Sequence, residues 1–282
     1  MRFGFGKNWE RYIKEHFSEE RVEISKDHML KFLETRDLQG KYFLDVGCGS
    51  GLHSLAALRA GAARIVSFDY DQDAVDTTRK LKEYAGNPHN WEIEQGSILD
   101  QEFLRGLQPA DIVYSWGVLH HTGEMWRAFR NTVELMKEDG CFYVALYVGE
   151  PYFGHPMEFW LEVKQNYNRA NWPGRKRMEC WYFWEFFLDK QWKNISGLIK
   201  QAREYKKSRG MDIYRDAVDW LGGWPMEYAS VDHVKRFAID GMGLALLGIK
   251  TGQANAEYLF ARPPRSAIDA QQAHSRPPGT PK

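Results

Sequence analysis

The chain has 282 residues, enough for one large domain or for a core domain with an added subdomain. Lys and Arg number 38, as do Asp and Glu, so the formal net charge is zero and no overall field attracts the chain to nucleic acid or to an anionic membrane. The three cysteines, Cys48, Cys141 and Cys180, are far apart and lack metal-ligand spacing, which argues against a disulfide scaffold, predicts no metal site and fits a reducing cytoplasm.

Residues 1–40 precede the first predicted strand and are expected to form an N-terminal helical segment. Charged residues such as Lys7 and Arg11 interrupt its apolar positions, so the sequence predicts neither a signal peptide nor a transmembrane segment. A second amphipathic segment covers residues 24–36. Two interpretations stay open: these helices cap a sheet, or the segment from Phe5 to Trp9 folds over a bound ligand.

The most informative stretch, residues 43–54, reads as a buried strand, a tight turn and a helix. Gly47, Gly49 and Gly51 occupy alternate positions of the turn, just after Asp45. Glycine accepts positive φ and lets a ligand lie against bare backbone. The nicotinamide fingerprint G-x-G-x-x-G is excluded because leucine stands where it needs its third glycine, and the Gly-Lys-Ser/Thr of a P-loop is absent.

What remains resembles motif I of the class I S-adenosylmethionine (SAM) methyltransferases, D/E-x-G-x-G-x-G. The resemblance implies that Asp45 and the three glycines bind SAM as the cofactor, with S-adenosylhomocysteine (SAH) as its product. The alternative is a glycine-rich turn without a ligand.

From residue 41 to about 148, strand and helix patterns alternate. The predicted strands are 41–46, 63–69, 91–95, 111–116 and 140–147, and the predicted helices are 51–61, 73–85, 100–106 and 124–137. Alternation of this kind implies parallel βαβ units in a doubly wound α/β sheet, whose ligands bind outside the carboxyl ends of the strands. The class I resemblance implies a mostly parallel sheet of seven strands.

The second strand ends in Phe-Asp-Tyr-Asp. An acidic residue about twenty positions after a glycine turn can accept both hydroxyls of a ribose, which makes Asp69 the candidate. Asp71 is the expected N-cap of the next helix, and Tyr70 is placed to pack on the adenine. The alternative for Asp69 is that it merely caps that helix.

The third strand is followed by a turn similar to the family's adenine-contacting G-D-x, with Ser97 in the place of the usual aspartate. The resemblance therefore assigns the adenine contact to the Ser97 hydroxyl or to the backbone of Ile98. Asp100 is expected to be the N-cap of the following helix.

The fourth strand ends in a segment similar to the S-x-x-V-L-H-H of many small-molecule methyltransferases, where the backbone passes the methionine end of SAM and the loop faces the acceptor. The resemblance assigns Ser115 and Trp116 to cofactor binding. His120 and His121 are the candidate catalytic bases, because the unperturbed pKa of histidine suits neutral pH. Only one of the two neighbours is expected to face the pocket, with His120 preferred, and the alternative is that both are structural.

After the fifth strand the fold's usual ending appears late, as a helix at 231–239 and strands at 243–249 and 257–261. Residues 151–229 form an insertion too long for a plain loop, so it must carry its own helices. Its dense aromatic residues fit a helical cap over the site, a dimer interface or an interfacial membrane anchor, and the cap is favoured because the insertion leaves from the carboxyl end of a strand.

The predicted organisation has five parts: an N-terminal helical cap segment (1–40), a SAM-binding Rossmann-like core (41–150), an aromatic-rich helical insertion (151–229), the last helix and β-hairpin of the core (230–262) and a disordered tail (263–282). Trp9, Tyr147 and Trp220 are the candidate substrate-binding residues. Gly-Gly-Trp-Pro at 222–225 predicts a turn near the junction of insertion and core.

The sequence therefore predicts a SAM-dependent methyltransferase that acts on O, N or S of a small molecule and releases SAH. A tRNA or protein methyltransferase is the first alternative, and the zero net charge and the lack of an RNA-binding module count against nucleic acid. A non-catalytic SAM-binding protein is the second alternative. A membrane-associated enzyme that acts on a lipid or quinone is a variant of the small-molecule interpretation. If the insertion is a dimer interface, the protein is a homodimer.

Overall fold

A computed structural model describes residue 6 and residues 17–188, 190–194, 197, 213–252 and 254–263. Within these residues seven strands form one sheet in the order β3-β2-β1-β4-β5-β7-β6. Their bounds are β1 (Tyr42–Val46), β2 (Arg64–Asp69), β3 (Trp91–Gln95), β4 (Ala110–Trp116), β5 (Met136–Tyr147), β6 (Ala245–Thr251) and β7 (Asn255–Ala261). Strands β1 to β5 pair in parallel, and β7 runs antiparallel to β5 and β6. The predicted seven-stranded, mostly parallel, doubly wound sheet is confirmed.

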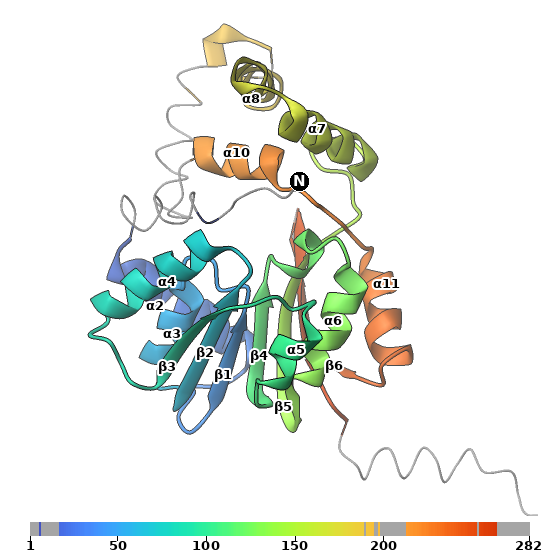
Figure 1. Ribbon diagram of the computed structural model, residues 1–282. Coiled ribbons are helices and arrows are strands. Elements are labelled where there is room, and N and C mark those ends of the chain that lie inside the picture. Colours follow the sequence, from blue (N-terminus) through green and yellow to red (C-terminus); the bar gives the residue numbers. More distant parts are fainter. Residues whose placement is uncertain are drawn as a thin grey trace, which may run out of the picture.

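Helices cover both faces of this sheet (Figure 1). One face carries α2 (Glu19–Phe32), α3 (Leu52–Arg59) and α4 (Gln72–Tyr84), and the other carries α5 (Gln101–Arg105), α6 (Met125–Glu134) and α11 (Val231–Lys235). Successive residues of a central strand enter the two cores in turn, as Phe43 and Leu44 do. Because both faces are buried, the strands read as continuous apolar runs rather than alternating ones.

Helices α7 (Met157–Arg169), α8 (Trp172–Phe186) and α10 (Ile213–Gly222) form a further layer beyond the carboxyl ends of the parallel strands, and we call these three helices the cap (Figure 1). The short 3-10 turns η1 (Leu119–His121) and η2 (Trp192–Asn194) follow β4 and α8. The cap has its own apolar core, in which Trp160 is fully buried and its indole N–H donates to the carbonyl of Tyr152 at 2.9 Å. Tyr147, at the end of β5, packs with its ring centroid 5.6 Å from that of Trp220 on α10, which joins the cap to the sheet.

Two predicted helix caps are confirmed. The Asp71 carboxylate accepts from the backbone N–H of Asp73, and the Asp100 carboxylate accepts from those of Glu102 and Phe103. These bonds satisfy N–H groups that a helix start leaves without an internal partner.

Several predicted boundaries were wrong by a few residues. Helix α6 ends at Glu134 and β5 begins at Met136, whereas the sequence predicted a helix to 137 and a strand from 140. Met136 pairs with Ala110 before a β-bulge, so charged residues that resemble a helix end belong to the strand. Strand β6 begins two residues later than predicted, and β7 begins two residues earlier. Helix α2 begins at Glu19 rather than at residue 24. The last predicted helix changes after α11 to a π-helical turn, η3 (Arg236–Asp240).

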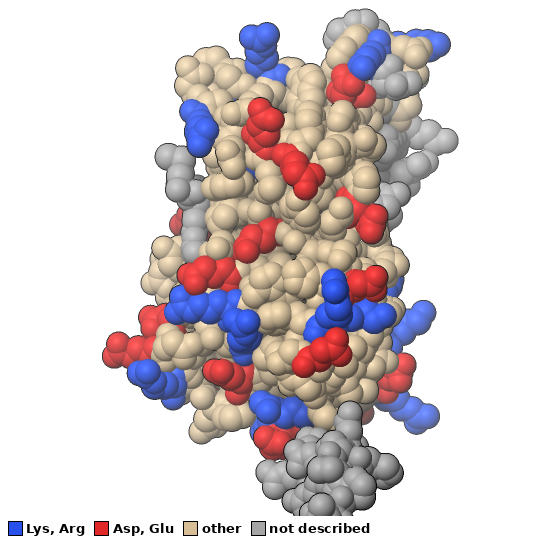
Figure 2. Space-filling view, turned by 90° about the vertical axis from the view of Figure 1, so that its right-hand side faces the viewer, with Lys and Arg blue, Asp and Glu red and all other residues tan. Residues whose placement is uncertain are grey.

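Charges of both signs are interspersed on the face of the molecule shown in Figure 2. Among the described residues, Lys and Arg lie beside Asp and Glu on this face, which shows no continuous basic strip for a phosphate backbone. The ion pair of Arg127 with Glu124 is an example of such neighbouring charges in the structure.

The cap core predicts a local effect on stability. Trp160→Ala should lower the free energy of unfolding by about 3–5 kcal/mol, because it removes a fully buried indole and leaves a cavity. The matched control is Trp172→Ala, whose side chain is 72% exposed and whose loss should stay within about 0.5 kcal/mol. Urea unfolding followed by circular dichroism measures both, and equal losses would contradict the packing described for the cap.

Candidate functional site

The glycine turn between β1 and α3 is fixed by its backbone and by close packing. Gly47, Gly49 and Gly51 have φ of 78°, 54° and 79°, a left-handed region that favours glycine. A Cβ at Gly47 would lie 2.4 Å from the side chain of Val118, and a Cβ at Gly51 would lie 2.8 Å from that of Thr78. The turn therefore needs glycine at these positions both for its conformation and for its contacts with the loop after β4 and with α4.

Asp69 ends β2 directly beside this turn. Its carboxylate accepts from the backbone N–H of Gly49 at 3.0 Å through one oxygen and from that of Asp71 at 2.9 Å through the other. Burial raises the pKa of Asp69 to about 6, although these N–H donors act to lower it. Each carboxylate oxygen has a second acceptor direction, so the arrangement fits the two hydroxyls of a ribose as well.

Asp45 lies deeper and accepts the last of three consecutive hydrogen bonds. Ser54 donates to Asp45, Ser54 and Ser67 lie 2.7 Å apart, and the indole N–H of Trp91 donates to Ser67 at 2.8 Å. Since the Ser54 hydroxyl hydrogen is directed to Asp45, Ser54 accepts from Ser67. Burial raises the pKa of Asp45 to about 7, and the charge of Asp69 adds to that rise. Two carboxyl groups held at one glycine turn suit a ligand that combines a ribose with positive charge.

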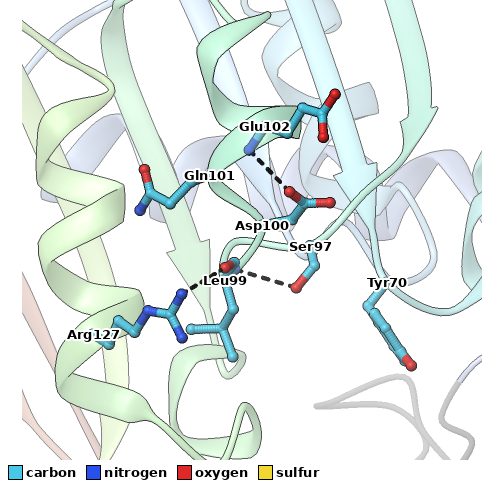
Figure 3. A pocket seen from close by; sticks show the side chains of 7 residues that line it. All are labelled: Tyr70, Ser97, Leu99, Asp100, Gln101, Glu102 and Arg127. Atoms are coloured by element: carbon cyan, nitrogen blue, oxygen red, sulfur yellow. Dashed lines mark hydrogen bonds between the residues drawn. The ribbon is translucent and has the colours of Figure 1, made fainter.

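A shallow depression lies at Tyr70, the residue after Asp69, and at the turn that follows β3 (Figure 3). Tyr70 and Ser97 form part of its lining, and Tyr70 is 61% exposed there. The Ser97 hydroxyl accepts from the N–H of Leu99 at 3.2 Å, whereas Ile98 is buried and its carbonyl accepts from Asn131 at 2.7 Å. Tyr70 and Ser97 therefore line the same depression, whereas Ile98 is buried and is not among its lining residues, and their contact with an adenine stays a prediction.

Ser115 and Trp116 end β4 in different environments. The Ser115 side chain is fully buried and its hydroxyl donates to the carbonyl of Val46 at 3.1 Å, so it ties β4 to β1. Trp116 is 40% exposed, and its ring centroid lies 6.0 Å from that of His53 at the start of α3. Of this predicted pair, Trp116 presents a side chain at the surface of the site.

The adjacent histidines of η1 have different tautomers. Nδ1 of His120 accepts from the backbone N–H of Tyr147 at 3.3 Å, so its Nε2 carries the hydrogen. Nδ1 of His121 lies 2.7 Å from the carbonyl of Pro225 and must donate to it, so its Nε2 carries the lone pair. Burial lowers the pKa of both, to about 3 for His121, and both are neutral near pH 7. The sequence preferred His120 as the base, whereas in this hydrogen-bond pattern His121 carries the Nε2 lone pair, on a ring that burial makes less basic than a free histidine.

The chain between α10 and α11 holds the histidine turn against the cap. Besides the Pro225 carbonyl, it supplies the N–H of Glu227, which donates to the carbonyl of His120 at 2.8 Å, and the Glu227 carboxylate, which accepts from the N–H of Met125 at 2.7 Å. Ala229 donates to the carbonyl of Tyr147 at 3.2 Å. The end of β5, the histidine turn and the end of the insertion are therefore one connected unit.

Sequence reasoning missed Lys164, Pro225 and Glu227. Lys164 lies four residues after Trp160 and three before Tyr167, which places it on the buried stripe of α7, and that spacing was a usable signal. Pro225 and Glu227 act through a carbonyl oxygen and through contacts more than 100 positions away in the sequence, for which no local pattern exists.

Among the predicted substrate-binding residues, the structure brings Tyr147 and Trp220 together, and Trp9 lies outside the described residues. Gly6 is described, and its N–H donates to the Asp71 carboxylate at 2.9 Å, so the chain before α2 reaches the edge of the site. Within the described residues, no group of three or more His, Cys, Asp or Glu side chains could hold a metal ion, and no helix has the length and apolar composition needed to span a bilayer.

Comparison with known proteins agrees with this geometry. Residues 44–142 match the family model of a methyltransferase domain. The ribosomal protein L11 methyltransferase of Pectobacterium carotovorum subsp. carotovorum (strain PC1) is 36% identical over 83 residues, which cover 29% of this chain and 25% of that protein. The chain thus spans about a quarter of the length of such relatives.

Two solved structures share the fold. Magnesium protoporphyrin IX methyltransferase from Synechocystis PCC 6803 with bound SAH superposes with a TM-score of 0.53 at 14% identity, covering 91% of this chain and 94% of that one. An O-methyltransferase family protein from Burkholderia thailandensis gives a TM-score of 0.51 at 14% identity, covering 87% and 56%. At such identities the likeness shows the fold.

The raised pKa of Asp69 predicts a pH-dependent affinity for adenosine. The ionised carboxylate accepts the ribose hydroxyls, so affinity should be lost as pH falls through about 6 and be about tenfold weaker at pH 5 than at pH 7. Adenosine is the probe because it lacks the amino acid group that would report on Asp45. Calorimetric titration should show a weaker, pH-independent affinity for Asp69→Asn, with Asp76→Asn on exposed α4 surface as the unchanged control. An Asp69→Asn variant that binds adenosine with wild-type affinity would show that Asp69 does not bind the ribose.

Proposed function

We propose that this chain, whose residues 44–142 form a class I SAM-dependent methyltransferase domain, transfers the methyl group of SAM to an O, N or S atom of a small-molecule acceptor. The observation that carries the proposal is the cap. Its aromatic core lies beyond the carboxyl ends of the parallel strands, where such sheets bind ligands, and reaches the histidine turn through Tyr147 and Trp220 (Figure 1).

A protein acceptor is the competing proposal, because the similar relatives are named for ribosomal protein L11. That similarity covers 29% of this chain, which is less than the core domain alone. The family match at residues 44–142 ends before the cap, in which we place acceptor recognition. The interspersed charges seen in Figure 2 likewise favour a small acceptor over RNA.

Bound SAM would supply a methyl group activated by a positively charged sulfur, and the sulfur would leave as the neutral thioether of SAH. The residues of this chain then bind the cofactor and the acceptor, align them and exclude water from the site. The glycine turn presents bare backbone, Asp69 holds the ribose, and the rings of the cap shield the acceptor from solvent. When the acceptor is a hydroxyl or an amine, the Nε2 atom of His121 takes its proton as the new bond to carbon forms.

The acceptor class is tested with SAM that carries a labelled methyl group. The purified chain and a cell lysate, separated after reaction into small-molecule filtrate, RNA and protein, should yield label in the filtrate. Label confined to protein or RNA would refute the small-molecule proposal. SAM binding without label in any fraction, and without turnover on a panel of pure alcohols, amines and thiols, would refute the enzyme proposal.

The base is tested with His121→Asn. The asparagine amide keeps a donor for the Pro225 carbonyl and removes the Nε2 lone pair, so kcat should fall by about 10²–10⁴-fold while SAH affinity stays the same. The comparison variant is His120→Gln, which keeps an N–H near the position of the His120 Nε2 donor and should lose less activity. A kcat within a few-fold of wild type for His121→Asn on a hydroxyl or amine acceptor would show that His121 is not the base.

A further inference from the structure

Lys164 is a fully buried lysine on the cap helix α7. Its side chain is 0% exposed, and its ammonium group donates to the carbonyl of Trp220 and lies 4.1 Å from the centroid of the Trp220 ring. Burial lowers its pKa to about 7, although the charge of Asp219 acts in the opposite direction. Burying an ammonium group is costly unless charges or strong acceptors compensate it, so such a residue calls for an explanation.

Two further N–H donors are buried nearby without a hydrogen-bond partner among the described residues. They are Nε2 of His120, which the Tyr147 contact forces to carry hydrogen, and Nε1 of Trp220, which can only donate. Exposed fractions of 0% for His120 and 8% for Trp220 keep both from bulk water. An unpaired buried donor costs about 1–3 kcal/mol, so two in one place suggest a ligand that completes them.

The three donors belong to one neighbourhood. The His120 ring stacks on Tyr147 with centroids 3.9 Å apart, and the Tyr147 ring in turn lies against Trp220. The Lys164 ammonium lies over the Trp220 ring. Burial, the charge of His121 and the charge of Lys164, in that order, lower the pKa of His120. Elements η1, α7 and α10 each contribute one donor.

We propose that His120, Lys164 and Trp220 bind a carboxylate of the methyl acceptor, so that the acceptor is a small organic acid with an apolar body. The inference rests on the proposed function and names its substrate class. A carboxylate is an acceptor-only group, which matches three N–H donors, and the Lys164 ammonium attracts it although the Asp219 carboxylate acts on the same ammonium. The rings of Tyr147 and Tyr152, which pack on Trp220, offer apolar surface to the rest of the acceptor.

Lys164 also has a structural contact that the experiment must separate from this role. Both Lys164 and Asn168 of α7 donate to carbonyl groups in the last turn of α10, Lys164 to Trp220 and Asn168 to Gly222 at 2.8 Å. Asn168→Ala therefore weakens the same helix end and leaves the ammonium in place, which makes it the matched control for Lys164→Met.

The experiment measures binding of two probes of similar shape, benzoate and benzamide, to the full chain saturated with SAH. Wild type should bind benzoate at least about tenfold more tightly than benzamide, a difference of about 1.4 kcal/mol. Lys164→Met should lose this preference, and Asn168→Ala should keep it. Unchanged SAH affinity verifies that each variant is folded.

A second readout needs no change at Lys164. The indole ¹H–¹⁵N signal of Trp220, assigned by its loss in Trp220→Phe, should shift when benzoate binds the wild-type SAH complex and stay in place with benzamide. Equal affinities for the two probes, a preference retained in Lys164→Met, or a Trp220 signal that ignores benzoate would overturn the inference. If label from SAM still enters the filtrate in that case, the proposed function stands and only the assignment of the acceptor as an organic acid is wrong. If benzoate is preferred and no label is transferred, the proposed function fails instead.

Discussion

The contact between Gly47 and Val118 is the constraint on which the rest of the site depends. Gly47 has a left-handed backbone and leaves no room for a Cβ, because the Val118 side chain would lie 2.4 Å away. Val118 directly precedes the histidine turn, so the loop expected to hold the cofactor and the loop expected to face the acceptor are fitted to each other. Asp69 completes the arrangement, since it binds the same turn through Gly49. A substitution in this contact would shift both halves of the reaction centre at once.

The chain that follows the cap is connected to that centre through backbone groups, in addition to the ring contact between Tyr147 and Trp220. The carbonyl of Pro225 and the N–H of Glu227 both bind the histidine turn, and Ala229 pairs with the end of β5. Main-chain bonds of this kind fix position with little dependence on side-chain conformation. The Pro225 carbonyl also determines the tautomer of His121, because a carbonyl oxygen can only accept and the Nδ1 atom that faces it must carry the hydrogen. The end of the insertion thus determines which ring nitrogen of His121, a residue of the core, carries the hydrogen.

The sequence was sufficient for those features that depend on backbone requirements and local pattern. The glycine turn, the N-caps Asp71 and Asp100 and the order of strands and helices all follow from short-range rules, and the structure agrees with them. The start of β5 was missed because a β-bulge opposite Ala110 lets charged residues continue a strand. The roles of Ser115 and of the two histidines could not be predicted, since they depend on which distant carbonyl or N–H each side chain meets. The spacing of Lys164 on α7 was a signal of its burial, whereas its contact with Trp220, 56 positions away, could not be predicted.

Charged groups whose pKa is shifted by burial lie both at the glycine turn and in the cap, where Glu179 is buried as well as Lys164. Asp45 and Asp69 place two carboxyl groups of raised pKa at the glycine turn, where a positively charged sulfur compound would favour their ionised forms. Lys164 places one ammonium of lowered pKa in the cap, where an anionic acceptor would favour its protonated form. Under the proposed function, a cationic cofactor and an anionic acceptor would each favour the charged form of the residues that they contact.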